Sequence, residues 1–275
     1  MDTIWLLPAL GFYALASIGF IADRIRRNSR LSGCAIAMLA AGAVFHALDQ
    51  VARGLQAGNI PVANFAQSLS FLAWLTALAS LVLIVRLRLA VVGAFVAPSV
   101  LLALGSSLLA TRSGTLAMPD TLRSFWLPIH VTLALLGEAL FVIAACVSLV
   151  YLVNEARLKA KRPFGPSDEF SPSLEKLDRI NYRLLGWGLG ALSLAIISGA
   201  IWAQGTWGRF WSWEPRELWS LVTWVLYATL LESRIAVGLR GRRAAALTLV
   251  FFTVLVGSYL GVSLVYPGKH GGTFG

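Results

Sequence analysis

The chain has 275 residues, of which 57% are hydrophobic and only 13% are charged. A soluble domain of this length would carry about twice that share of charged residues, so the composition excludes an ordinary water-soluble protein and indicates a polytopic membrane protein. The formal net charge of +10 would suggest nucleic-acid binding in a soluble protein, but in a membrane protein it is typical of basic cytoplasmic loops, and we expect no nucleic-acid partner.

Apolar stretches of about 20 residues, the length that crosses a bilayer as a helix, recur along the chain. They predict eight spans, at residues 4–22, 31–51, 65–85, 90–110, 125–153, 184–203, 217–231 and 244–266. The predicted fold class is therefore all-α: a polytopic membrane helical bundle in which residues 1–275 form a single membrane domain. The first stretch lacks preceding basic residues and a small-residue cleavage site, so we interpret it as a retained span and not a signal peptide.

Lysine and arginine residues divide unevenly between the two sides of such a bundle. Eight spans place both termini on one side, and only six of the 23 lysine and arginine residues fall there: Arg53, Arg112, Arg123, Arg209, Arg216 and Lys269. Because basic loops stay in the cytoplasm, this side is predicted to be extracytoplasmic. The polar, proline-interrupted segment 154–183 is then a cytoplasmic loop with some helix near 174–182, and segment 202–217 faces outward.

The two cysteines, Cys34 and Cys146, lie in apolar stretches, and the chain has no CxxC or CxxCH motif. This pattern predicts neither a thiol redox pair nor haem bound covalently to this chain. We expect both cysteines to be small residues of the core.

Tryptophan is concentrated in residues 202–224, which hold six of the ten: Trp202, Trp207, Trp211, Trp213, Trp219 and Trp224. Pro215 suits the first position of a helix, which predicts Glu214 at the N-cap and Glu217 in the first turn. One interpretation of the aromatic residues is an interfacial belt that anchors a helix at headgroup level. A belt needs one or two tryptophans per helix end, so we favour a binding platform in segment 202–217.

Two of the three histidines are predicted on the same side as this platform: His130 at the outer entrance of the fifth span, and His270 beyond the eighth. A single histidine at a membrane edge is usually a hydrogen-bonded interfacial residue, but two beside an aromatic platform would suit a porphyrin whose iron takes two imidazoles. Arg209 or Arg216 would then meet the propionates. Pairing of these arginines with Glu214 and Glu217 is an equally supported alternative.

Three further ionisable residues fall inside predicted spans. His46 lies about 9 Å of helix rise from the outer end of the second span, which makes it a candidate cofactor-binding residue. A neutral histidine bonded to a neighbouring helix is the alternative that we favour for it. Glu138 lies two turns below His130 on the same helix face. Glu232 lies about 22 Å from the outer end of the seventh span, and we expect it to pair with Arg234 or Arg240.

The segment WGRFWSWEPRELWSLVTW, residues 207–224, resembles the tryptophan-rich signature of the CcsA/ResC/CcmC haem-handling family. The matching residues are Trp207, Gly208, Trp211, Trp213 and Glu217, while Glu214 stands where the family usually has Asp. The segment WLPIHV around His130, residues 58–74 and the position of His270 also agree with the family. The length and the eight spans resemble its system II branch, CcsA/ResC, more than the shorter CcmC.

The resemblance implies a role in cytochrome c biogenesis, in which non-covalently bound haem b is presented for attachment to the CxxCH motif of an apocytochrome c. It implies His130 and His270 as axial ligands of the iron, and Trp207, Trp211, Trp213 and Glu217 as the haem shelf, with no acid–base residue on this chain. It also implies a CcsB/ResB-like membrane subunit as partner in a cytochrome c synthase. The bacterial cytoplasmic membrane is the expected location, ahead of the plastid thylakoid.

Two points of this resemblance stay open. Family members often read LH near the inner end of the span after the signature, whereas this chain reads LLES, with Glu232 in that place. The route by which haem would enter is therefore not assigned. The alternative function is a haem-binding membrane protein without lyase activity, such as a CcmC-like haem transporter or a HemX-like regulator of haem synthesis.

Overall fold

The computed structural model describes residues 4–26, 29–62, 64–110, 124–160 and 172–265, and within these ranges it is helical, without strands. The predicted all-α membrane bundle is confirmed. Its eight helices are α1 (Leu6–Arg26), α2 (Ser29–Ala57), α3 (Phe65–Leu87), α4 (Ala90–Ala110), α5 (Trp126–Lys159), α6 (Leu174–Trp207), α7 (Pro215–Ala236) and α8 (Arg242–Val265).

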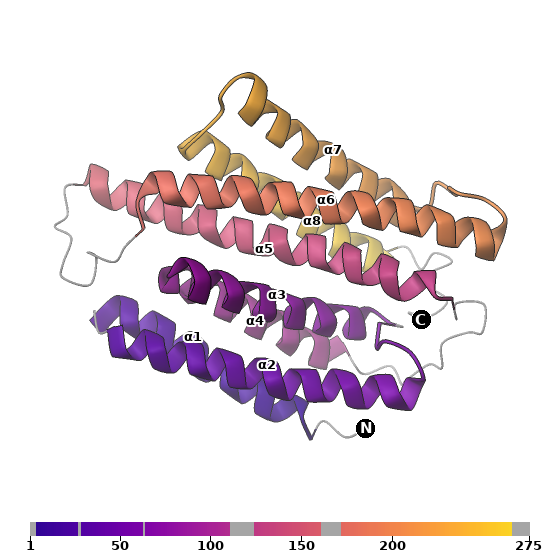
Figure 1. The fold of residues 1–275 in the computed structure, drawn as a ribbon, viewed down its shortest axis with the longest axis horizontal. Helices are drawn as coiled ribbons and strands as arrows, with labels where there is room; N and C mark the ends of the chain where they lie inside the picture. The colour runs from indigo at the N-terminus through magenta and orange to yellow at the C-terminus, as the bar shows by residue number, and fades with distance from the viewer. Residues whose placement is uncertain (1–3, 27–28, 63, 111–123, 161–171, 266–275) are drawn as a thin grey trace.

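The helices run up and down in alternation and form two groups (Figure 1). Helices α1 to α4 make one group, α5 to α8 make the other, and α3 and α4 contact α5 where the groups meet. The longest helices, α5 and α6, have 34 residues each and pack along one another. Because directions alternate, the start of α5 and the link between α6 and α7 lie at the same end of the bundle, on the right in Figure 1.

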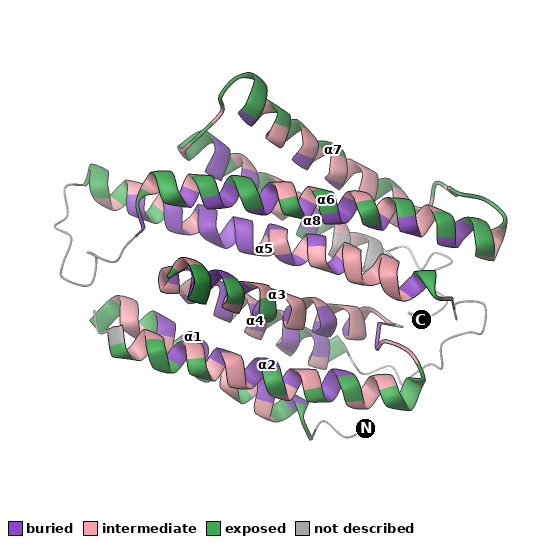
Figure 2. Cartoon of the chain, viewed as in Figure 1, coloured by how far each residue is buried: buried purple, intermediate pink, exposed green. Residues whose placement is uncertain are grey.

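Apolar surface faces outward as well as inward (Figure 2). Large hydrophobic side chains are exposed along the outer faces of several helices, among them Ile18, Val82, Leu102 and Ile197. In water such surfaces would be costly, whereas in lipid they are the expected exterior. Among the described residues, six helices, α1 to α6, have the length and apolar character of a membrane span.

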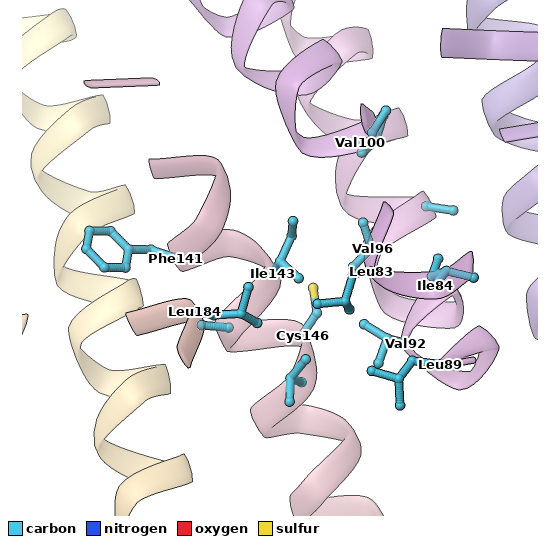
Figure 3. Close-up of a cluster of buried hydrophobic side chains, with 14 of the residues drawn as sticks. Leu83, Ile84, Leu89, Val92, Val96, Val100, Phe141, Ile143, Cys146 and Leu184 are labelled. Atoms are coloured by element: carbon cyan, nitrogen blue, oxygen red, sulfur yellow. The ribbon is translucent and has the colours of Figure 1, made fainter. Parts of the chain in front are cut away.

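The buried core joins both helix groups. Leu83 and Ile84 of α3 and Val96 of α4 pack towards Ile143 and Cys146 of α5 in the same cluster (Figure 3). Cys146 is 4% exposed, as expected of a small core residue. The same expectation is wrong for Cys34, which lies on an exposed face of α2.

The end of the bundle where α5 finishes and α6 begins is called the basic end, because most lysine and arginine residues are predicted on that side. Helices there are longer than the spans that hydropathy predicted. The predicted loop 154–183 is mostly helical at its two ends, because α5 continues to Lys159 and α6 begins at Leu174. Some of the polar residues there are paired within their own helix. Glu155 pairs with Lys159 at 2.8 Å, four residues along α5. The Ser173 side chain caps α6 by accepting a hydrogen bond from the backbone N–H of Lys176 at 3.2 Å.

A buried ion pair at this end ties α6 to α7. Arg234, whose side chain is 4% exposed, donates to Asp178 Oδ2 at 2.7 Å, and its guanidinium lies 5.3 Å from the ring centroid of Tyr182. The predicted pair between Glu232 and Arg234 is therefore wrong, and the alternative pair with Arg240 is not formed among the described residues either. Two residues along a helix are separated by about 200°, so Arg234 points into the bundle while Glu232 is exposed. Within the described part of the chain, Glu232 makes no hydrogen bond or ion pair.

Candidate functional site

His130 lies one turn into α5, half-buried, at the end of the bundle where α6 finishes. Its Nδ1 is 2.8 Å from the carbonyl oxygen of Ala195 on α6. A carbonyl oxygen only accepts hydrogen bonds, so Nδ1 must carry the ring proton and donate it. The lone pair of the neutral imidazole is therefore on Nε2, which is the nitrogen that would bind a metal.

One face of α6 holds the His130 ring in place. Gly199 lies directly beneath the ring, since a Cβ on this residue would be 2.6 Å from both Nδ1 and Cε1 of His130. Trp202 stacks beside the imidazole, with ring centroids 6.3 Å apart and planes 20° apart. Trp207 in turn meets Trp202 edge to face at 4.9 Å. Aromatic rings thus run from His130 to the last residue of α6.

The tryptophan-rich segment is more helical than predicted. Trp202 and Trp207 belong to α6, which ends at Trp207 and is followed by the C-cap Gly208 with a left-handed φ of 72°, and α7 begins at Pro215. The α6–α7 link, residues 208–214, is therefore the non-helical part of the predicted segment 202–217. Within it Trp211 and Trp213 meet at 6.0 Å with their rings nearly perpendicular. The link lies at the end of the bundle where α5 begins (Figure 1).

Exposure differs sharply along the α6–α7 link. Trp213 is 72% exposed and Phe210 60% exposed, whereas Trp211 is half-buried. The indole Nε1 of Trp211 is shielded from solvent and has no hydrogen-bond partner within the described residues. The link therefore combines a shielded indole donor with exposed apolar ring surface.

Glu217 holds the α6–α7 link against the start of α7. Its carboxylate accepts hydrogen bonds from the backbone N–H of Ser212 at 2.8 Å, from the Ser212 hydroxyl at 2.8 Å and from the backbone N–H of Glu214 at 3.3 Å. The predicted helix start is confirmed, because Glu214 is the N-cap, Pro215 opens the helix and Glu217 completes a capping box. The geometry gives Glu217 a supporting role, and direct contact with a ligand stays a prediction.

The two candidate arginines lie at different depths. Arg209 is exposed on the link, and Arg216, in the first turn of α7, is half-buried. Arg216 interacts electrostatically with Glu138, the acidic residue two turns below His130 on α5. Glu138 Oε2 is shielded from solvent and makes no hydrogen bond within the described ranges. The Glu138 carboxyl group and the Arg216 guanidinium are therefore near enough to interact electrostatically.

His46 is fully buried on α2, in a polar cluster shared by α1, α2 and α3. Its Nδ1 is 3.3 Å from the hydroxyl of Tyr13, and its Nε2 lies 2.9 Å from the hydroxyl of Ser70 and 3.2 Å from the side-chain amide nitrogen of Gln50. This is the arrangement that the sequence favoured, a histidine bonded to neighbouring helices. Both ring nitrogens are occupied by side chains of the bundle.

His270, the predicted second ligand, lies outside the described residues, so its place beside His130 stays a prediction. Within the described ranges, no three His, Cys, Asp or Glu side chains gather as a metal site would require. The site that can be described is thus one imidazole with a row of indoles, which suits a flat aromatic ligand with one protein-bound axial position.

Three contributors to this site were missed by sequence analysis: the Ala195 carbonyl, Gly199 and Trp202 as a partner of His130. They follow at i, i+4 and i+7 on α6 and so share one helical face. That spacing is visible in the sequence. Which helix faces His130 is not, because it depends on the packing of α5 on α6.

The sequence is similar to a known protein family and to several of its members. Residues 62–270 match the family described as Cytochrome C assembly protein. The cytochrome c biogenesis protein CcsA of Chlamydomonas reinhardtii is 32% identical over 228 residues, which cover 78% of this chain and 61% of the algal protein. That of Guillardia theta is 32% identical over 242 residues, covering 79% and 78%. The CcsA protein of Prochlorococcus marinus is 29% identical to this chain. The alignment covers 98% of this chain and 93% of the Prochlorococcus protein.

A solved structure also resembles the fold. The cytochrome c haem lyase CcmF superposes with a TM-score of 0.63 and 17% sequence identity, covering 98% of this chain and 52% of that chain. At this identity the likeness shows a shared fold.

Proposed function

The chain belongs to the family of cytochrome c assembly proteins, and from that membership we propose that it binds haem at the extracytoplasmic membrane face and presents it to apocytochrome c. The observation that carries the proposal is the 2.8 Å contact between His130 Nδ1 and the Ala195 carbonyl oxygen, from which the tautomer of the ring follows. The Nδ1–H of His130 donates to this carbonyl, so the lone pair of the neutral ring is on Nε2, and the ring lies next to Trp202, which in turn contacts Trp207.

The residues of the site suit haem b held without a covalent bond. Histidine is a common axial ligand of haem iron, and a carbonyl that accepts from the other ring nitrogen raises the basicity of the ligand. The half-buried Trp207 and Trp211 and the exposed Trp213 offer aromatic surface to a macrocycle. His270 is proposed as the second axial ligand on the family resemblance described above.

Charged residues complete the proposed site. Arg209 and Arg216 are proposed to meet the propionates, since guanidinium binds carboxylate in a charge-assisted, often bidentate way. Glu217 is proposed to act by holding the α6–α7 link, because its oxygens accept bonds from Ser212 and Glu214. His46 is proposed to stay outside the haem site, because its ring is held by Tyr13, Ser70 and Gln50.

Haem attachment forms thioether bonds between haem vinyl groups and cysteine thiols of the apocytochrome. For this step the chain contributes position: it binds the haem, orients it and holds it at the surface, and we assign it no acid or base. We propose that it does so as a subunit of a cytochrome c synthase in the bacterial cytoplasmic membrane, with a CcsB/ResB-like membrane protein as partner.

The test is to co-express the chain with a ResB-like partner, purify the complex and record its haem absorption spectrum beside the yield of a matured c-type cytochrome. His130→Ala is expected to lose haem or change its spectrum, and added imidazole to restore part of it. Normal spectra and normal maturation in His130→Ala would contradict the assignment. Bound haem without any cytochrome maturation would favour a haem transporter or a regulator of haem synthesis.

A further inference from the structure

We propose that Gly199 of α6 is a positioning residue for His130, present because the imidazole needs the space that a side chain would fill. The effect on haem rests on the proposed function above. The effect on the histidine ring rests on packing alone and is testable without haem.

The contact leaves no room for even a methyl group. A Cβ on Gly199 would lie 2.6 Å from Nδ1, 2.6 Å from Cε1 and 3.4 Å from Cγ of His130. Cβ atoms in proteins do not approach other heavy atoms to 2.6 Å, and the atoms met belong to a rigid ring and not to the end of a flexible chain. With any other residue at position 199, the ring or the helix must move.

The helices cannot separate easily to make that room. Two turns along α5 from His130, a Cβ on Gly137 would be 3.0 Å from the carbonyl oxygen of Gly188 and 3.2 Å from the backbone nitrogen of Leu192. Phe141 lies one turn further along α5, and a Cβ on Gly188 of α6 would be 2.6 Å from its ring. The α5 and α6 backbones are therefore close-packed below the site, and interiors of this kind resist added volume.

The ring cannot move without losing what defines its chemistry. Its Nδ1 donates to the Ala195 carbonyl, one turn before Gly199, and Trp202 stacks beside it, one turn after. If the ring is displaced from Gly199, the 2.8 Å hydrogen bond to the Ala195 carbonyl is lost. The tautomer with its lone pair on Nε2 is then no longer favoured. Outer-shell bonds of this kind orient a ligating histidine and typically change metal affinity about 10- to 100-fold when removed.

Gly190 provides a matched control on the same helix. It is exposed, and a Cβ there would meet no heavy atom within 4 Å. Gly199→Ala and Gly190→Ala make the same chemical change inside α6 and gain the same intrinsic helix propensity, so the two variants differ in the contact with His130.

The experiment uses the full chain with its ResB-like partner and four variants: Gly199→Ala, Gly190→Ala, His130→Ala and the Gly199→Ala/His130→Ala double. Abundance and unfolding temperature are measured on the chain without haem, and the haem spectrum and reduction potential on the complex. We expect Gly199→Ala to retain haem about tenfold less well or with a shifted potential. Gly190→Ala should behave as wild type, and Gly199→Ala should add nothing in the His130→Ala background.

Equal behaviour of Gly199→Ala and Gly190→Ala would overturn the proposal, as would an undiminished effect of Gly199→Ala in chains without His130. If Gly199→Ala fails to accumulate, the double variant should recover abundance because the ring is gone; no recovery would overturn it. If the wild-type complex holds no haem, the proposed function fails. The positioning role of Gly199 is then tested by unfolding temperatures alone: the Gly199→Ala change must lower the unfolding temperature of the wild-type chain more than it lowers that of the His130→Ala chain.

Discussion

Asp178 on α6 receives the Arg234 guanidinium of α7 at 2.7 Å, although the two residues are 56 positions apart. The same carboxylate accepts the backbone N–H of Gly241 at 3.0 Å, at the turn that leads into α8. One side chain therefore ties three helices together at the basic end of the bundle, opposite the candidate site.

Removing this carboxylate is predicted to destabilise the bundle strongly. Asp178→Ala leaves Arg234, with a side chain only 4% exposed, without its counter-charge, and breaking a buried pair costs about 3 kcal/mol. The control is Glu175→Ala, one turn earlier on α6. Glu175 pairs with Arg179 at 2.6 Å but its side chain is 82% exposed, so its loss should cost about 0.5 kcal/mol or less. Unfolding by SDS in mixed micelles compares the two, and equal losses would contradict the buried role of Asp178.

The α6–α7 link is predicted to depend on Glu217. Glu217→Ala removes the acceptor of three hydrogen bonds and should cost about 2 kcal/mol, loosening the link around Trp211 and Trp213. Glu217→Gln keeps one acceptor oxygen of the capping box and should retain most of the stability. Limited proteolysis and tryptophan fluorescence report on the link. If both variants behave alike, the carboxylate acts by its charge and not by these bonds.

His46 is predicted to matter for stability and not for haem. The buried Ser70 hydroxyl and Gln50 amide both bond to the His46 ring nitrogen Nε2. The His46→Leu change removes this partner and should lower the free energy of unfolding by about 1–3 kcal/mol. The haem spectrum of the complex should keep its wild-type shape. A His46→Leu chain of normal abundance that binds no haem would place His46 in the haem path.

Glu232 is predicted to contribute neither to the stability of the bundle nor to haem binding. It is exposed, and Arg234 is engaged by Asp178, so Glu232→Ala should change the free energy of unfolding by no more than about 0.5 kcal/mol. A carboxylate is also a poor substitute for imidazole as a haem ligand. Loss of haem from Glu232→Ala at normal abundance, measured by the same absorption spectrum, is the result that would refute this.

The arrangement of basic residues predicts which side of the membrane each end of the bundle faces. In the structure α1 begins at the same end as α3, α5 and α7, as an up-and-down bundle requires (Figure 1). A reporter fused after Gly275 should be active only in the extracytoplasmic compartment. Activity confined to the cytoplasm would invert the topology and move the candidate site to the other face.

Hydropathy predicted the helices well where a helix is apolar throughout. The span at residues 90–110 coincides with α4 (Ala90–Ala110), and the span from residue 65 begins where α3 does, at Phe65. It failed where polar residues continue a helix, as in α5 and α6, because pairs such as Glu155 with Lys159 satisfy charges that a hydropathy scale counts against helix. Helix length and membrane span are thus different quantities.

The candidate site was also predictable from the sequence only in part. That His130 and the tryptophan-rich segment share one end followed from the alternation of spans and from charge. That the ring lies on Gly199 and donates to Ala195 did not, because it depends on the rotation of α6 about its axis relative to α5. Rotation is set by many small packing contacts along both helices, and single-sequence patterns carry little information about it.

Trp213 has a left-handed backbone, with φ at 57°, in the exposed part of the α6–α7 link. This conformation costs a residue with a side chain roughly 1–2 kcal/mol, and glycine would adopt it without that cost. Because its indole is 72% exposed, burial within the chain recovers little of the energy. Trp213→Gly should therefore leave the free energy of unfolding of the isolated protein unchanged or raised, so the fold of this chain does not require the indole that the link exposes.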